Sequence, residues 1–123
     1  MNEYINYPMA IGGALVLGAI VFVINFPHGV LAATIAASKQ ALYTFFAGGF
    51  IARNGENLAV KWSNRRLALL TSIVVSTLIA VALTLLVHSL RGTPEPLQST
   101  IPTLLLSPIG FFIIGWRRQQ QAA

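Results

Sequence analysis

Four long apolar runs, separated by short polar links, dominate the pattern of this sequence. The helices that they predict cover about residues 8–26, 29–53, 65–90 and 100–117. At a rise of about 1.5 Å per residue, runs of close to twenty residues match the hydrocarbon thickness of a bilayer. The runs are continuous, whereas strands of a transmembrane barrel alternate apolar and polar positions. The sequence therefore predicts an all-α integral membrane four-helix bundle that forms one domain over residues 1–123.

Composition supports a membrane protein and excludes several kinds of chemistry. Of 123 residues, 55% are hydrophobic and only 9% are charged, which leaves too few polar residues to cover a water-soluble fold. Because the chain has no cysteine, disulfides and thiolate sites are excluded. It has no phosphate-binding loop, nucleophile elbow or HExxH pattern, so we expect no cofactor.

The basic residues predict the orientation of the helices. Six of them occur in the link between the second and third runs and in the C-terminal tail: Arg53, Lys61, Arg65, Arg66, Arg117 and Arg118. The other two links contain only Arg91, which Glu95 balances. Since short cytoplasmic loops are enriched in Lys and Arg, both termini should be cytoplasmic in an inner or plasma membrane. The net charge of +5 then reflects topology, and we expect no binding to nucleic acid.

The links contain residues that commonly cap or end helices. Asn25 to Gly29 predicts a short external hairpin between the first two helices, with Asn25 as a capping candidate near Pro27. On the cytoplasmic side, Ser63 or Asn64 can cap the third helix. Gln119 to Gln121 should be the solvated end of the tail.

Lys39 is the one charged residue near the centre of a predicted span. A lysine there costs about 2.5 to 3.5 kcal/mol on insertion scales. The three acids, Glu3, Glu56 and Glu95, belong to aqueous or interfacial segments, so none should pair with it. Three explanations stay open: the side chain is deprotonated or extends along the helix toward the interface, it lines an electropositive cavity for an anion or lipid head group, or it pairs with an acid of a partner protein.

Helical periodicity selects further residues that could act with Lys39. His28 and Tyr43 fall on the same side of the second helix at about 100° per residue. Thr77 and Thr84 share one face of the third helix. The candidate ligand-binding residues are therefore Lys39, Tyr43, His28, Thr77 and Thr84.

Small residues predict where helices approach closely. The second helix carries such a strip opposite Lys39, and the first helix carries another; their members are Ala33, Ala37, Ala41 and Gly48, and Ala10, Ala14 and Gly18. Small residues let helix backbones pack tightly in a membrane. We therefore expect close helix contacts and a homo-oligomer, in its simplest form a two-fold dimer.

The sequence also contains weaker candidates for a metal site and for an enzymatic site. His28 and His88 are both expected at the outer boundary, but two histidines without a carboxylate or cysteine make a poor metal site, so we expect none. A lipid-modifying enzyme would need acid or base groups at the membrane edge. The one candidate cluster is Arg53, Asn54, Glu56 and Asn57, which is better explained as a solvated turn around Gly55.

The function expected from the sequence is non-enzymatic. One hypothesis is a small homo-oligomeric channel, carrier, or lipid- or anion-binding protein with Lys39 in a membrane-embedded cavity. The alternative is an accessory or scaffolding subunit of a larger membrane complex. Membrane lipids are expected partners in both cases, and other membrane subunits only in the second.

Overall fold

Helices make up nearly the whole structure. The computed structural model describes residues 3–90 and 93–123, and no strand occurs within these ranges. The elements are α1 (Tyr7–Asn25), η1 (Phe26–His28), α2 (Val30–Tyr43), η2 (Thr44–Gly48), α3 (Gly49–Ala59), α4 (Arg65–Leu90) and α5 (Pro96–Ala122). The expected all-helical class is confirmed for these residues.

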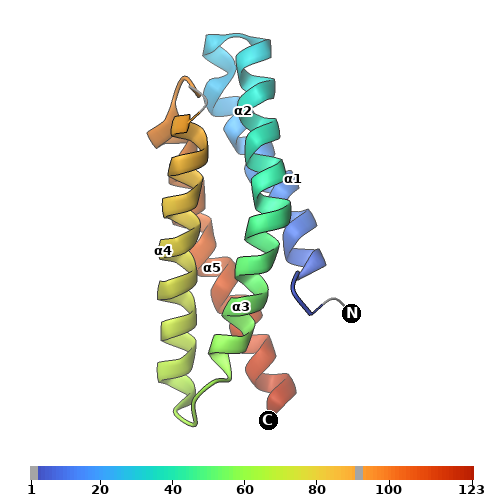
Figure 1. The fold of residues 1–123 in the computed structure, drawn as a ribbon, viewed down its shortest axis with the longest axis vertical. Coiled ribbons are helices and arrows are strands. Elements are labelled where there is room, and N and C mark those ends of the chain that lie inside the picture. Colours follow the sequence, from blue (N-terminus) through green and yellow to red (C-terminus); the bar gives the residue numbers. More distant parts are fainter. Residues whose placement is uncertain (1–2, 91–92) are drawn as a thin grey trace.

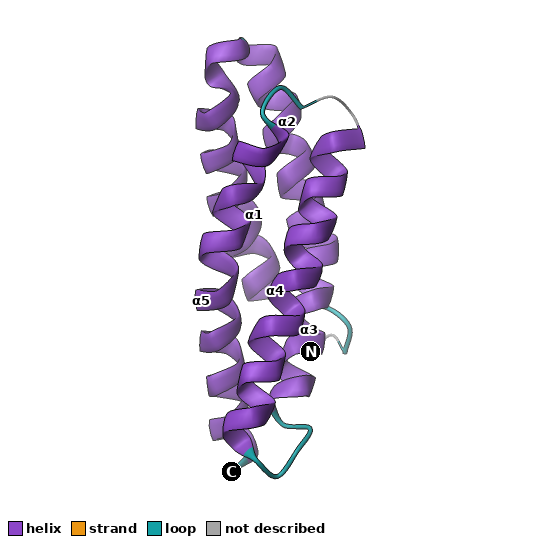
Figure 2. Cartoon of the chain, turned by 90° about the vertical axis from the view of Figure 1, so that its left-hand side faces the viewer, coloured by secondary structure: helices purple, strands orange, loops and turns teal. Residues whose placement is uncertain are grey.

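Four continuous helical stretches are long and apolar enough to cross a membrane. They are Tyr7–His28, Val30–Ala59, Arg65–Leu90 and Pro96–Ala122. Along their lengths α1 packs against α2, α4 packs against α5, and α3 contacts both α4 and α5. Figures 1 and 2 show an elongated bundle in which these stretches run roughly side by side. The N- and C-termini both lie toward the end that carries the α3–α4 loop (Figure 1).

The second and fourth stretches are longer than the sequence predicted. The second continues past residue 53 to Ala59, and the fourth begins at Pro96 and ends at Ala122. Where α3 ends, the buried Gln119 donates from Nε2 to the carbonyls of Ala59 and Arg65, at 2.6 and 2.8 Å, and so joins the extended C-terminal part of α5 to the end of α3. The prediction that Gln119 belongs to a solvated tail is therefore wrong, because this side chain caps the end of α3.

The cap predicted before α4 is present, whereas the cap predicted between the first two helices is not. Asn64 caps α4 by accepting a hydrogen bond from the Leu67 amide at 3.1 Å, which confirms one of the two predicted caps. Asn25, in contrast, does not cap the second helix. The reversal there is made by η1 and by Gly29, whose φ of 103° is readily adopted only by glycine.

Small residues form the closest helix contacts. A Cβ placed on Gly18 of α1 would lie 3.4 Å from the Cβ of Ala41, so the predicted strips on the first two helices do meet. A Cβ on Gly49 of α3 would lie only 2.9 Å from the Cβ of Ala10. These contacts bring backbones together, as is common for helices packed in lipid.

The interior contains many polar and small apolar side chains, whereas large apolar side chains cover the exterior. The largest fully buried side chains include His88, Gln40 and Asn25. Large apolar residues cover the outside along every long helix; Leu15, Leu31 and Leu105, for example, are 71%, 75% and 63% exposed. A water-soluble protein shows the opposite distribution.

Candidate functional site

A chain of buried hydrogen bonds connects α4 to α2 through His88. His88 Nε2 lies 2.9 Å from Gln40 Oε1, and its Nδ1 lies 3.1 Å from the Thr93 hydroxyl. Gln40 in turn donates from Nε2 to the Thr44 hydroxyl at 2.8 Å. Because an amide oxygen only accepts hydrogen bonds, His88 donates from Nε2, and the Thr93 hydroxyl can donate to Nδ1. A neutral imidazole therefore satisfies both of its partners.

Lys39 and Tyr43 lie beside this chain of hydrogen bonds, where α2 faces α4. The Tyr43 hydroxyl donates to the Ala80 carbonyl at 3.0 Å and adjoins the side chain of Thr84. The Lys39 ammonium is buried and near enough to His88 for charges on the two groups to interact. The structure thus brings three of the five sequence-predicted ligand residues together between two helices.

The other two predicted ligand residues lie apart from this group. Thr77 is buried on α4, and its hydroxyl has no hydrogen-bond partner in the described part of the chain. His28 is exposed in η1, where its Nε2 lies 3.0 Å from Glu95 Oε1. Since α2 begins only at Val30, helical periodicity does not extend to His28, and the expected shared side with Lys39 is not formed.

The two histidines have different surroundings and share no partner. His88 is buried with Gln40 and Thr93, whereas His28 pairs with Glu95 at the surface. Within residues 3–90 and 93–123, no group of three or more His, Asp or Glu residues is placed to hold a metal ion.

A cavity of about 280 Å³ lies near the middle of the long helices, mainly between α1, η2 and α5. Its wall is largely apolar, with polar side chains at five positions: Gln40, Tyr43, Thr44, Thr103 and Ser107. Thr103 is 2% exposed, and its hydroxyl has no hydrogen-bond partner within the described ranges. Lys39 does not line the cavity, but its neighbour Gln40 does and connects it to His88. A mostly apolar wall with a few polar groups is typical of a site for a small or amphiphilic ligand.

Two local features of the backbone border this cavity. Residues 44–48 form a π-turn, η2, in which Thr44 and Gly48 contribute to the wall. Such turns inside α-helices frequently occur at functional sites. Gly12 of α1 also lines the cavity; it is exposed, and a Cβ added there would meet nothing within 4 Å.

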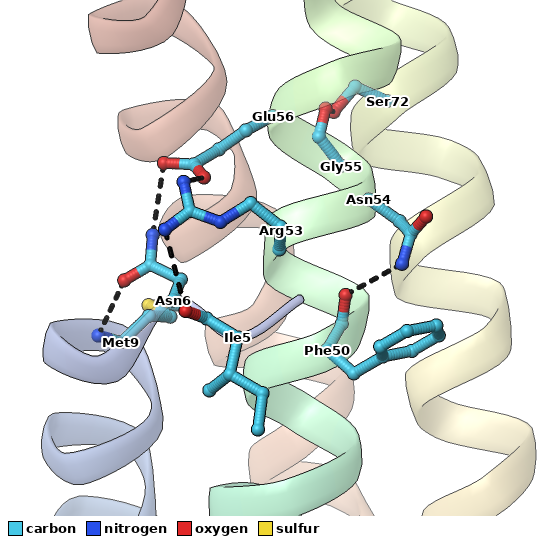
Figure 3. A network of polar contacts seen from close by, with 9 residues as sticks. All are labelled: Ile5, Asn6, Met9, Phe50, Arg53, Asn54, Gly55, Glu56 and Ser72. Carbon is cyan, nitrogen blue, oxygen red and sulfur yellow. Dashed lines mark hydrogen bonds and ion pairs between the residues drawn. The ribbon is translucent and has the colours of Figure 1, made fainter. Parts of the chain in front are cut away.

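A second polar group lies where α1 begins, between α1 and α3 (Figure 3). Arg53 and Glu56 form an ion pair, and Asn6 donates from Nδ2 to Glu56 Oε1 at 3.0 Å. Arg53 also reaches the Ile5 carbonyl at 3.4 Å. Asn54, which the sequence grouped with Arg53 and Glu56, points to the other side and donates to the Phe50 carbonyl.

At the opposite end of the bundle, Asn25 joins α1 to α5. Its Nδ2 donates to Ser99 Oγ at 2.8 Å and to the Val21 carbonyl at 2.9 Å. Its Oδ1 accepts from the Glu95 amide at 3.2 Å. Asn25 is therefore a structural link between helices, a role that its sequence position in a turn did not indicate.

Sequence reasoning missed Gln40, although a signal for it exists. An amide in the middle of an apolar run must find partners, because an unpaired polar group is costly inside a membrane. The cavity itself had no such signal, because its shape depends on which helices become neighbours.

Comparisons with protein-family models, curated proteins and solved structures give no match to this chain.

Proposed function

We propose that this protein crosses an inner or plasma membrane four times, with both termini in the cytoplasm, and binds or carries an amphiphilic ligand in the cavity between its helices. The exposed large apolar side chains and the polar groups buried between the helices support insertion, because lipid takes the place of water around the apolar exterior. The distribution of Lys and Arg supports the orientation.

The cavity between α1, η2 and α5 carries the proposal for ligand binding. It is bordered by exposed α1 and α5 residues, among them Val16 and Ile109, so it adjoins the surface that would face lipid. The unpartnered Thr103 hydroxyl and the Gln40 amide offer polar contacts within it. Lys39 contributes as a positive charge behind Gln40 and Tyr43. None of the described residues that line the cavity is an Asp, Glu, Lys, Arg or His.

Filling the cavity should reduce ligand retention. Both Gly12 and Ala19 are exposed on α1, but only Gly12 lines the cavity, so Gly12→Leu adds a side chain at its edge and Ala19→Leu adds the same side chain away from it. We expect the wild type and Ala19→Leu to retain membrane lipid through purification in mild detergent, as measured by native mass spectrometry. Gly12→Leu should retain clearly less lipid while unfolding at a similar temperature. Equal retention by all three proteins would contradict the proposal.

The same purification tests how the protein assembles. We propose a homo-oligomer, and a self-assembled species without other proteins would support it. Other proteins that co-purify in a fixed ratio would instead favour an accessory subunit of a larger complex.

A further inference from the structure

A pocket rich in arginine adjoins the start of α1. It has a volume of about 420 Å³, and its charged lining residues are Arg53, Glu56, Arg117 and Arg118. We call it the arginine pocket. Arg53 and Arg118 also line a second pocket of about 630 Å³, to which Glu3 contributes. In the arginine pocket itself, three positive charges face one carboxylate, so the pocket favours an anion.

Two arginine atoms in this region lack hydrogen-bond partners. The Nε atoms of Arg53 and Arg118 are buried and make no hydrogen bond within the described residues. For Arg53, Nη1 is occupied by Glu56 and Nη2 contacts the Ile5 carbonyl (Figure 3). Buried donors are normally paired, and a phosphate oxygen is a favourable acceptor for a guanidinium N–H.

The start of α1 adds to the positive potential. Asn6 and Pro8, which line the arginine pocket, lie at the N-terminal end of a helix of 19 residues. The helix dipole places partial positive charge at this end. The pocket therefore combines three guanidinium groups and a helix N-terminus.

The arginine pocket lies next to the apolar cavity, because Met9 and Ile113 line both of them. A charged space at the arginines and a mostly apolar space at mid-helix are therefore neighbours along the α1–α5 boundary. This arrangement matches a molecule with an anionic head and an apolar tail.

We infer that the α1–α5 boundary binds an anionic phospholipid of the cytoplasmic leaflet, with its phosphate at Arg118 and Arg53 and one acyl chain in the cavity. This inference rests on the proposed function and names the class of ligand. A soluble phosphate could satisfy the arginines, but it would leave the adjoining apolar cavity without a role.

The test is a lipid titration of the full chain in detergent, followed by native mass spectrometry. Phosphatidylglycerol and phosphatidylcholine with identical acyl chains serve as probes. We expect the wild type to prefer phosphatidylglycerol, and Arg118→Gln to weaken its binding roughly tenfold while phosphatidylcholine binding stays the same. Arg66→Gln, at an exposed arginine that lines neither pocket, should retain the preference. Inorganic phosphate at the same concentration as the lipid should not displace it.

Failure of this inference and failure of the proposed function give different results. Equal binding of both lipids to the wild type, with Gly12→Leu still reducing both, would overturn the head-group assignment alone. An Arg118→Gln defect without any effect of Gly12→Leu would overturn the role of the cavity and, with it, the acyl-chain part of the inference. Displacement by inorganic phosphate would show that the arginines bind phosphate independently of a lipid. The thermal unfolding midpoint of each variant shows whether it is still folded. Arg118→Lys, which keeps the positive charge, should retain part of the preference for phosphatidylglycerol.

Discussion

At the scale of single residues, buried amides organise this protein. Gln40 connects His88 to Thr44, and Asn25 connects α1 to Ser99 of α5. Each amide uses donor and acceptor atoms with different partners, so it fixes both distance and rotation between helices. In a membrane, apolar side chains gain little by moving from lipid to a helix interface. Such hydrogen bonds therefore contribute more to the choice of packing partner between helices than they do in a water-soluble protein.

Lys39 should be tolerated rather than required for folding. Its ammonium is buried near His88. We expect Lys39→Met to fold and to unfold at a higher temperature in detergent, because the substitution removes a charge that costs about 2.5 to 3.5 kcal/mol on insertion scales. Lys61→Met, at an exposed position, is the control and should change the midpoint little. A lower midpoint for Lys39→Met would mean that the fold depends on this cation.

At the scale of the elements, part of the packing could be predicted. The strips of small residues on the first two helices do meet, at Gly18 and Ala41. This contact could be predicted because helical periodicity shows which side of each helix carries only small side chains. The partner of Ala10 could not be predicted in the same way. It is Gly49, beyond the π-turn, and that turn shifts the periodicity of every residue that follows it.

Two glycine substitutions should separate tight packing from open space. In Gly49→Ala the new Cβ would lie 2.9 Å from the Cβ of Ala10, and an alanine cannot rotate away. We expect a loss of about 1–3 kcal/mol in the free energy of unfolding, as is usual for overpacked cores. Gly12→Ala meets no atom within 4 Å and should be neutral or slightly stabilising, since alanine favours helix. Comparison of the two unfolding midpoints in detergent is the measurement, and similar midpoints would argue against the close α1–α3 contact.

At the scale of the whole molecule, the sequence predicts the number and order of the long helices because hydropathy acts locally. The cavity and the arginine pocket could not be predicted. Arg53 and Arg118 are far apart in the sequence, and only the packing of α3 against α5 brings them to the same pocket. The chemistry of this region is thus a property of the assembled bundle.

The absence of cysteine allows a direct test of topology. Single cysteines at three exposed positions, Pro94→Cys, Ser63→Cys and Gln120→Cys, report on the α4–α5 link, the α3–α4 link and the C-terminal end. We expect a membrane-impermeant thiol reagent to label only Pro94→Cys in intact cells and all three after permeabilisation, because basic segments stay in the cytoplasm. Labelling of Gln120→Cys in intact cells would contradict the proposed orientation.

The π-turn at residues 44–48 also affects how this gene can vary in length. A π-turn holds one residue more than the α-helical turn that it replaces. Loss of one codon there should convert the segment into ordinary α-helix. The residues before and after it would then still face the same neighbouring helices. Loss of a codon elsewhere in the same stretch would rotate the following part by about 100° and move its polar side chains away from their partners. Residues 44–48 are therefore where this stretch best tolerates the deletion of a single residue.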